Sequence, residues 1–133
     1  MFKPLHDIVL WLEKRKSLAW SLTILYASFI FYLSSLPTIQ APLIVAIPSF
    51  LKHVAEYSVF GFLLLASLRA SNYDGKEALI LAVVVASLYG VTDEIHQYFV
   101  PGRFFSYTDM LADFLGSLFA IVSKPRIEKV REI

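Results

Sequence analysis

The sequence contains no cysteine, which excludes disulfide bonds, thiolate metal ligands and thiol-based catalysis. Charge is also scarce: only 17% of the 133 residues are charged and the formal net charge is +1, so no basic field favours nucleic acid as a partner. Neither a nucleophilic serine motif nor a phosphate-binding glycine loop is present. Apolar residues, in contrast, make up 57% of the chain, which indicates a membrane protein.

Four apolar stretches are long enough to cross a bilayer, whose core of roughly 30 Å needs about 20 residues at about 1.5 Å each. They are Leu18–Leu36, Phe50–Leu68, Ala78–Tyr98 and Phe104–Ser123. The fourth depends on its first residues, because Tyr107–Ser123 alone would be a short span. The first is too long for a cleaved signal peptide and is interpreted as a retained signal anchor. The predicted fold is all-α, a four-transmembrane-helix bundle over residues 17–133.

Residues 1–16 precede this bundle and carry Leu5, Ile8, Val9 and Leu12 at helical spacing, with Trp11 nearby. Such a pattern is typical of a short amphipathic helix lying at the membrane interface. The alternative is a frayed basic tail.

The basic residues predict the orientation of the bundle. Ten of the twelve lie on one side of the four predicted spans: Lys3, Lys14, Arg15, Lys16, Arg69, Lys76, Lys124, Arg126, Lys129 and Arg131. Lys52 and Arg103 lie on the other side. Because cytoplasmic loops are rich in Lys and Arg, this asymmetry predicts a multi-pass protein with both termini in the cytoplasm.

Polar residues of three predicted spans then fall toward the outer side of the membrane. They are Lys52, His53 and Glu56 in the second span, Asp93, Glu94, His96 and Gln97 in the third, and Asp109 and Asp113 in the fourth, with Arg103 on the loop between the last two. A charged side chain in hydrocarbon costs roughly 2.5 to 3.5 kcal/mol, so these residues are expected to face the bundle interior or a wet cavity. Helical spacing places them in three stripes that can meet in one pocket.

Simpler readings stay open for several of these residues. Ser106 and Asp109 fit a capping box that starts a helix.

Gly116 and Ala120 form a small-xxx-small pattern, which predicts that this face of the last helix packs closely on a neighbour and buries Asp113. The alternative for the buried charges is a purely structural polar knot, which stabilises the bundle and takes no part in catalysis or binding.

The sequence resembles the VanZ-like family of small bacterial membrane proteins, named for a member linked to teicoplanin resistance. The similarity lies in His53-x-x-Glu56-Tyr57 with Gly61, in Asp93-Glu94-x-His96-Gln97-x-Phe99-Val100-Pro101-Gly102-Arg103-x-x-Ser106-x-x-Asp109 with Gly116, and in Ser34-Ser35-Leu36-Pro37. The family often has Asn where Asp113 stands and Gly where Ala120 stands. The resemblance implies an integral protein of the bacterial plasma membrane with a role in glycopeptide tolerance, but no settled biochemical activity.

The leading functional hypothesis is a site that binds or processes a lipid-linked cell-envelope component at the outer leaflet. The candidate catalytic residues are Glu94, Asp93, His53, Glu56 and Asp113, and the candidate substrate-binding residues are Arg103, Gln97, Lys52, Tyr57, Asp109 and His96. Basic side chains would hold a phosphate, a carboxylate would act as base and a histidine would carry a proton. Whether the site is catalytic stays open.

Two other functions remain as alternatives: a proton-coupled transporter or flippase that uses Glu56 and Asp113, and a non-catalytic bundle that modulates a partner protein. A homo-oligomer is compatible with each of them. No cofactor is expected, although His53, Glu56, Asp93, Glu94 and Asp109 offer the nitrogen and oxygen ligands of a divalent metal site. Arg103, Lys52 or protonation would balance the carboxylates without a metal.

Overall fold

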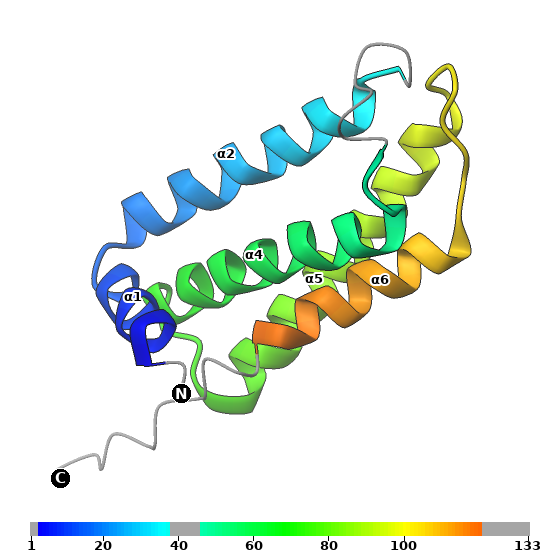
Figure 1. Cartoon of the computed structure of the whole chain (residues 1–133). Helices are drawn as coiled ribbons and strands as arrows, with labels where there is room; N and C mark the ends of the chain where they lie inside the picture. The colour runs from blue at the N-terminus through cyan, green and yellow to red at the C-terminus, as the bar shows by residue number, and fades with distance from the viewer. Residues whose placement is uncertain (1–2, 38–45, 121–133) are drawn as a thin grey trace, which may run out of the picture.

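The computed structural model describes residues 3–37 and 46–120, apart from the side chains of Leu5 and His6. This part of the chain forms five helices and no strand, which confirms the all-α prediction (Figure 1). The helices are α1 (Lys3–Glu13), α2 (Lys16–Ser35), α4 (Ser49–Ala70), α5 (Gly75–Tyr98) and α6 (Tyr107–Leu118).

Three of these helices, α2, α4 and α5, are long and apolar enough to cross a membrane. Their ends lie within three residues of the predicted spans, because each span is predominantly apolar and is bounded by polar or proline residues. Helix α6 has only 12 residues, or about 18 Å at 1.5 Å per residue, which is shorter than a bilayer core. The predicted fourth crossing is therefore not confirmed, and its last residues, 121–123, lie outside the described part.

The outer faces of the long helices are apolar and exposed. On α2, Ile24, Leu25 and Phe29 are at least half exposed, and on α5 Ile80 and Leu88 are each 61% exposed. A soluble protein rarely leaves such continuous apolar surface in water, whereas lipid tails cover it without cost. Together with the three apolar helices, this surface identifies a membrane protein.

Helix α4 lies at the centre, between α2 on one side and α5 and α6 on the other (Figure 1). Its aromatic residues Tyr57 and Phe60 fill the core, against small residues of α5 such as Ala82 and Ala86. Helix α6 runs back along α4 from the end at which the α5–α6 loop lies, and this is the most extensive helix pair of the described chain. The site described below is built at that end.

The contact between α4 and α6 depends on small residues in both helices. A Cβ atom on Gly116 would lie 2.6 Å from the carbonyl oxygen of Val54, and one on Gly61 would lie 3.0 Å from that of Ser117. Ala120 is also fully buried on this face. The predicted packing of α6 through Gly116 and Ala120 is thus confirmed, and close backbone approach fixes the depth of α6 relative to α4.

Helix α1 forms over Lys3–Glu13, as the periodicity predicts, and lies across the opposite end of the bundle (Figure 1). Its buried residues Val9 and Leu12 pack with Ala19 and Ala66. An ion pair of 3.2 Å between Glu13 and Arg69 adds a polar link to α4. Two further apolar side chains of α1, Ile8 and Trp11, are exposed.

Candidate functional site

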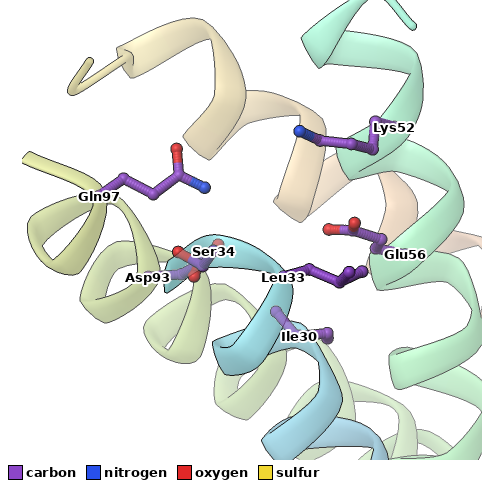
Figure 2. A pocket seen from close by; sticks show the side chains of 7 residues that line it. All are labelled: Ile30, Leu33, Ser34, Lys52, Glu56, Asp93 and Gln97. Atoms are coloured by element: carbon purple, nitrogen blue, oxygen red, sulfur yellow. The ribbon is translucent and has the colours of Figure 1, made fainter. Parts of the chain in front are cut away.

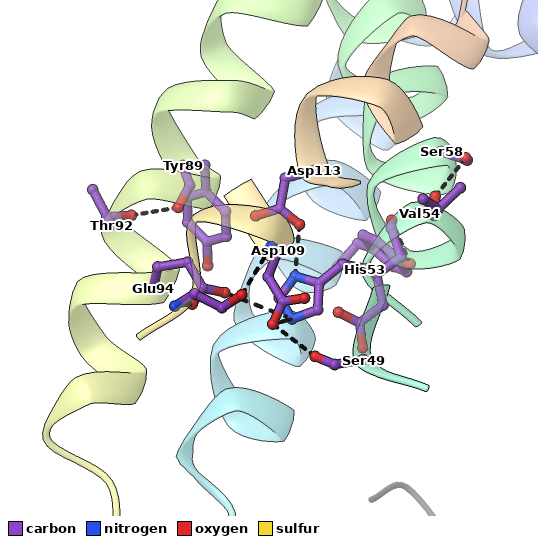
Figure 3. Close-up of polar contacts among 12 residues, drawn as sticks. Ser49, His53, Val54, Ser58, Tyr89, Thr92, Glu94, Asp109 and Asp113 are labelled. Carbon is purple, nitrogen blue, oxygen red and sulfur yellow. Dashed lines mark hydrogen bonds and ion pairs between the residues drawn. The ribbon is translucent and has the colours of Figure 1, made fainter. Parts of the chain in front are cut away.

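The candidate site centres on the imidazole of His53, which lies one turn into α4 and is 1% exposed (Figure 3). Its Nδ1 lies 2.6 Å from Oδ1 of Asp113, which is fully buried in α6. Its Nε2 lies 3.7 Å from Oε1 of Glu94 in α5 and 3.7 Å from Oδ2 of Asp109 in α6. Three helices thus bring three carboxylates around one imidazole.

The start of α6 positions two of these carboxylates. Ser106 is the N-cap, and its hydroxyl accepts a hydrogen bond from the Asp109 backbone N–H at 3.2 Å, so the serine half of the predicted capping box is confirmed. The reciprocal bond comes from Glu94, whose Oε2 accepts from the Ser106 N–H at 3.0 Å. The Asp109 carboxylate therefore remains available, and Asp113 follows it one turn later on the same face.

The Asp109 carboxylate is held from α4 instead. Ser49, the first residue of that helix, donates its hydroxyl to Asp109 Oδ2 at 2.7 Å. Since the same oxygen is 3.7 Å from His53 Nε2, the serine fixes Asp109 facing the imidazole.

Gly90 of α5 makes room for Asp113. A Cβ atom at position 90 would lie 2.5 Å from Asp113 Oδ2 and 2.8 Å from its Cβ, so any larger residue would displace the aspartate. The carboxylate of α6 consequently packs directly on the backbone of α5. This contact fixes the position of Asp113 and, through it, the ring of His53.

Several polar atoms of the cluster have no hydrogen-bond partner among the described residues. They are His53 Nε2, Glu94 Oε1 and Asp113 Oδ2. Native proteins pair the great majority of buried polar side-chain atoms, so each exception requires an explanation. His53, Glu94 and Asp113 also offer one ligand atom each within 4.8 Å of one another, which makes this cluster a candidate for metal binding.

A second group of the predicted residues lines a small pocket beside this cluster, between α2, α4 and α5 (Figure 2). Lys52 and Glu56 come from α4, and Asp93 and Gln97 come from α5. The side chains of Lys52 and Gln97 extend toward each other across the pocket. Its remaining lining residues are Ile30, Leu33 and Ser34 of α2.

The three remaining candidates lie outside both groups. Arg103 donates from Nε to the Leu36 carbonyl at 2.9 Å and from Nη2 to the Leu33 carbonyl at 3.3 Å. It thereby satisfies carbonyls at the C-terminal end of α2, where a cation is favourable. These bonds give Arg103 a structural role that the sequence analysis did not foresee.

His96 lies on the seam between α2 and α5. Its ring stacks on Phe31 with centroids 4.3 Å apart, and its Nε2 lies 2.8 Å from Ser35 Oγ. Tyr57 is fully buried below the His53 ring, with their planes 9° apart, and its hydroxyl has no described hydrogen-bond partner. Neither residue contacts the carboxylates around His53 in a described hydrogen bond.

Comparison with known proteins agrees with the resemblance noted in the sequence. The VanZ/LLP1 family model matches residues 2–125, which is most of the chain and contains both the His53 cluster and the pocket. The chain belongs to the VanZ/LLP1 family. No curated protein and no solved structure matches this VanZ-type chain.

Two contributors to the site were not singled out from the sequence. Ser49 directly precedes the second predicted span, and the sequence signal for its role is its place one turn before His53. Gly90 lies in the third predicted span, but the need for a residue without a Cβ there depends on the distance between α5 and α6. Both roles arise from contacts between helices.

Proposed function

We propose that this VanZ-type protein binds or processes a lipid-linked component of the cell envelope within the bacterial plasma membrane. The observation that carries the proposal is the pocket between α2, α4 and α5, where Lys52 and Gln97 meet two carboxylates beside the buried His53 cluster. Exposed apolar faces on the same helices would let an acyl or polyprenyl chain lie against the protein while its head group meets Lys52 at the pocket.

Each polar residue has a role in this proposal. The Lys52 ammonium holds a phosphate or another anionic group, and the Gln97 amide donates a second hydrogen bond. Asp113 orients the His53 imidazole, which leaves His53 Nε2 and Glu94 Oε1, both without a described hydrogen-bond partner, for the chemistry of the bound substrate. Arg103 positions the α5–α6 loop through its bonds to α2.

The second candidate is a non-catalytic bundle that modulates a partner protein, with the cluster as a structural polar knot. It is favoured by the complete burial of Glu94 and Asp113. The two candidates differ in what the pocket does: a lipid-binding site requires Lys52, whereas a polar knot around His53 does not.

Replacing Lys52 with glutamine is expected to remove bound anionic lipid, because the pocket would lose its only cation among its lining residues. The measurement is mass spectrometry of lipids that co-purify with the detergent-solubilised protein, together with teicoplanin susceptibility of the cells. Lys76→Gln is the matched control, since this exposed lysine lies in the first turn of α5 at the other end of the bundle. We expect at least a tenfold loss of lipid for the first variant and no change for the second. Equal lipid content in both would contradict the lipid-binding function.

We further propose that both termini are cytoplasmic and that the pocket opens toward the outer leaflet, on the basis of the ten-to-two distribution of basic residues. Single cysteines at Phe104 and Asp74, both exposed and in opposite loops, report the two sides. A polar maleimide should label Phe104→Cys in intact cells and Asp74→Cys only after permeabilisation. The reverse pattern would overturn the orientation. Labelling of Glu132→Cys in intact cells would show that the chain does not complete a fourth crossing.

A further inference from the structure

The unpartnered nitrogen of His53 faces two carboxylates at a distance that a hydrogen bond does not span. Because an ionised carboxylate only accepts, the short contact with Asp113 assigns its proton to Nδ1. Nε2 is left 3.7 Å from both Glu94 and Asp109, whereas a charge-assisted N–H···O bond is about 2.7 to 2.9 Å long. Among the described residues, Nε2 is thus within ion-pair distance of both carboxylates but forms a hydrogen bond with neither.

The two distances from His53 Nε2 instead match those between ligands of one metal ion. Nitrogen and oxygen ligands lie about 2.0 to 2.2 Å from a zinc ion, so two ligands of one tetrahedral ion are roughly 3.4 Å apart. The two distances of 3.7 Å are close to that value. Glu94 Oε1 has no described hydrogen-bond partner, while Asp109 Oδ2 accepts a hydrogen bond from Ser49.

The charges of the cluster also favour a bound cation. Glu94, Asp109 and Asp113 surround one histidine, so with all three carboxylates ionised the cluster has an excess of negative charge even when the imidazole is protonated. Burying such an excess is costly unless a cation compensates it. Arg103, the nearby basic residue of the α5–α6 loop, directs two of its N–H groups to carbonyls of α2.

We infer that His53 Nε2, Glu94 Oε1 and Asp109 Oδ2 bind a divalent transition-metal ion, with Asp113 orienting the imidazole from behind. One nitrogen and two carboxylate oxygens suit zinc or manganese, whereas calcium and magnesium prefer all-oxygen shells. Metal-binding histidines usually donate their other ring N–H to a carboxylate. The contact between His53 Nδ1 and Asp113 Oδ1 matches that arrangement. Three protein ligands leave a coordination position for water or substrate.

This inference adds a cofactor to the site and does not depend on the lipid nature of the substrate. The ligand set also differs from the one expected from the sequence. Glu56 and Asp93 line the neighbouring pocket, and Asp113 has the role of a positioning residue.

The test is the metal content of the full-length, tag-free protein in detergent, dialysed against trace zinc and manganese and measured by mass spectrometry. We expect about one ion per chain in the wild type, and a melting temperature that falls on chelation and recovers when the metal returns. Glu94→Gln and Asp109→Asn should each retain little of the ion. Asp113→Asn should bind it roughly 10- to 100-fold more weakly.

Asp93→Asn is the matched control, because it removes an equally buried carboxylate from the same end of the bundle without touching the proposed ligands. It should keep the ion, as should Lys52→Gln, which separates this inference from the lipid-binding function. The proposed metal site would be wrong if the wild type bound neither zinc nor manganese and neither ion changed its melting temperature. Equal retention by wild type, Glu94→Gln and Asp109→Asn would do the same.

Discussion

Replacing Gly116 with leucine is expected to abolish the folded bundle, the largest effect that we predict for any single change. A Cβ atom at this position already falls 2.6 Å from the Val54 carbonyl oxygen and 3.1 Å from its Cα, both part of the α4 backbone. Because neither atom can move aside without displacing the helix, even Gly116→Ala should cost about 3 kcal/mol of folding free energy. Thermal unfolding in detergent and the yield of monodisperse protein measure both variants.

Phe119→Leu is the matched control, since Phe119 follows α6 directly and is half exposed. Its melting temperature should stay close to that of the wild type. If Gly116→Leu and Phe119→Leu melt alike, α6 does not pack on α4 through this face, and the position of Asp109 and Asp113 beside His53 would be wrong as well.

Replacing Asp113 with leucine is expected to destabilise the protein by about 3 to 5 kcal/mol, the usual cost of removing one partner of a buried charged pair. The His53 ring would lose its 2.6 Å contact and remain buried among the other carboxylates. The measurement is again the unfolding temperature, combined with the teicoplanin-susceptibility assay.

Asp113→Asn separates the charge of this residue from its hydrogen bond. The amide oxygen can still accept from the Nδ1–H of His53, and its volume fits the space beside Gly90, so most of the stability should remain. A loss as large as that of the leucine variant would show that the negative charge, rather than the acceptor, holds the imidazole.

The helices of the bundle were predictable to the extent that hydropathy alone defines them. Helices α2, α4 and α5 are long apolar runs, and their ends are set by polar or proline residues that the sequence displays. The start of α6 was placed too early because Phe104 and Phe105 extend the apolar run. In the structure Phe104 is 82% exposed on the loop, and the helix begins only after the Ser106 cap.

The site was predictable in its location but not in its division into two groups. Asp93 and Glu94 are consecutive, so their side chains point about 100° apart on α5. Asp93 consequently faces the pocket with Lys52, while Glu94 faces Ser106 and His53. Sequence spacing gives this angle, but not which neighbour each face meets, because that depends on the rotation of α5 against α2 and α6.

The role of Arg103 could not be predicted from the sequence for a similar reason. A lone arginine next to buried carboxylates is reasonably interpreted as a phosphate ligand. Its actual partners, the carbonyls of Leu33 and Leu36, lie about 70 residues earlier in the chain and carry no side-chain signal.

The contact between Gly90 and Asp113 limits how this chain can change over evolutionary time. A Cβ at position 90 would lie 2.5 Å from Asp113 Oδ2 and 2.8 Å from Asp113 Cβ, so a side chain is tolerated there only if α5 and α6 also move apart or position 113 also changes. An exchange between aspartate and asparagine keeps the shape and leaves the glycine in place. Geometry therefore couples the two positions, and a change at Gly90 alone is expected to be tolerated less well than a change from aspartate to asparagine at position 113.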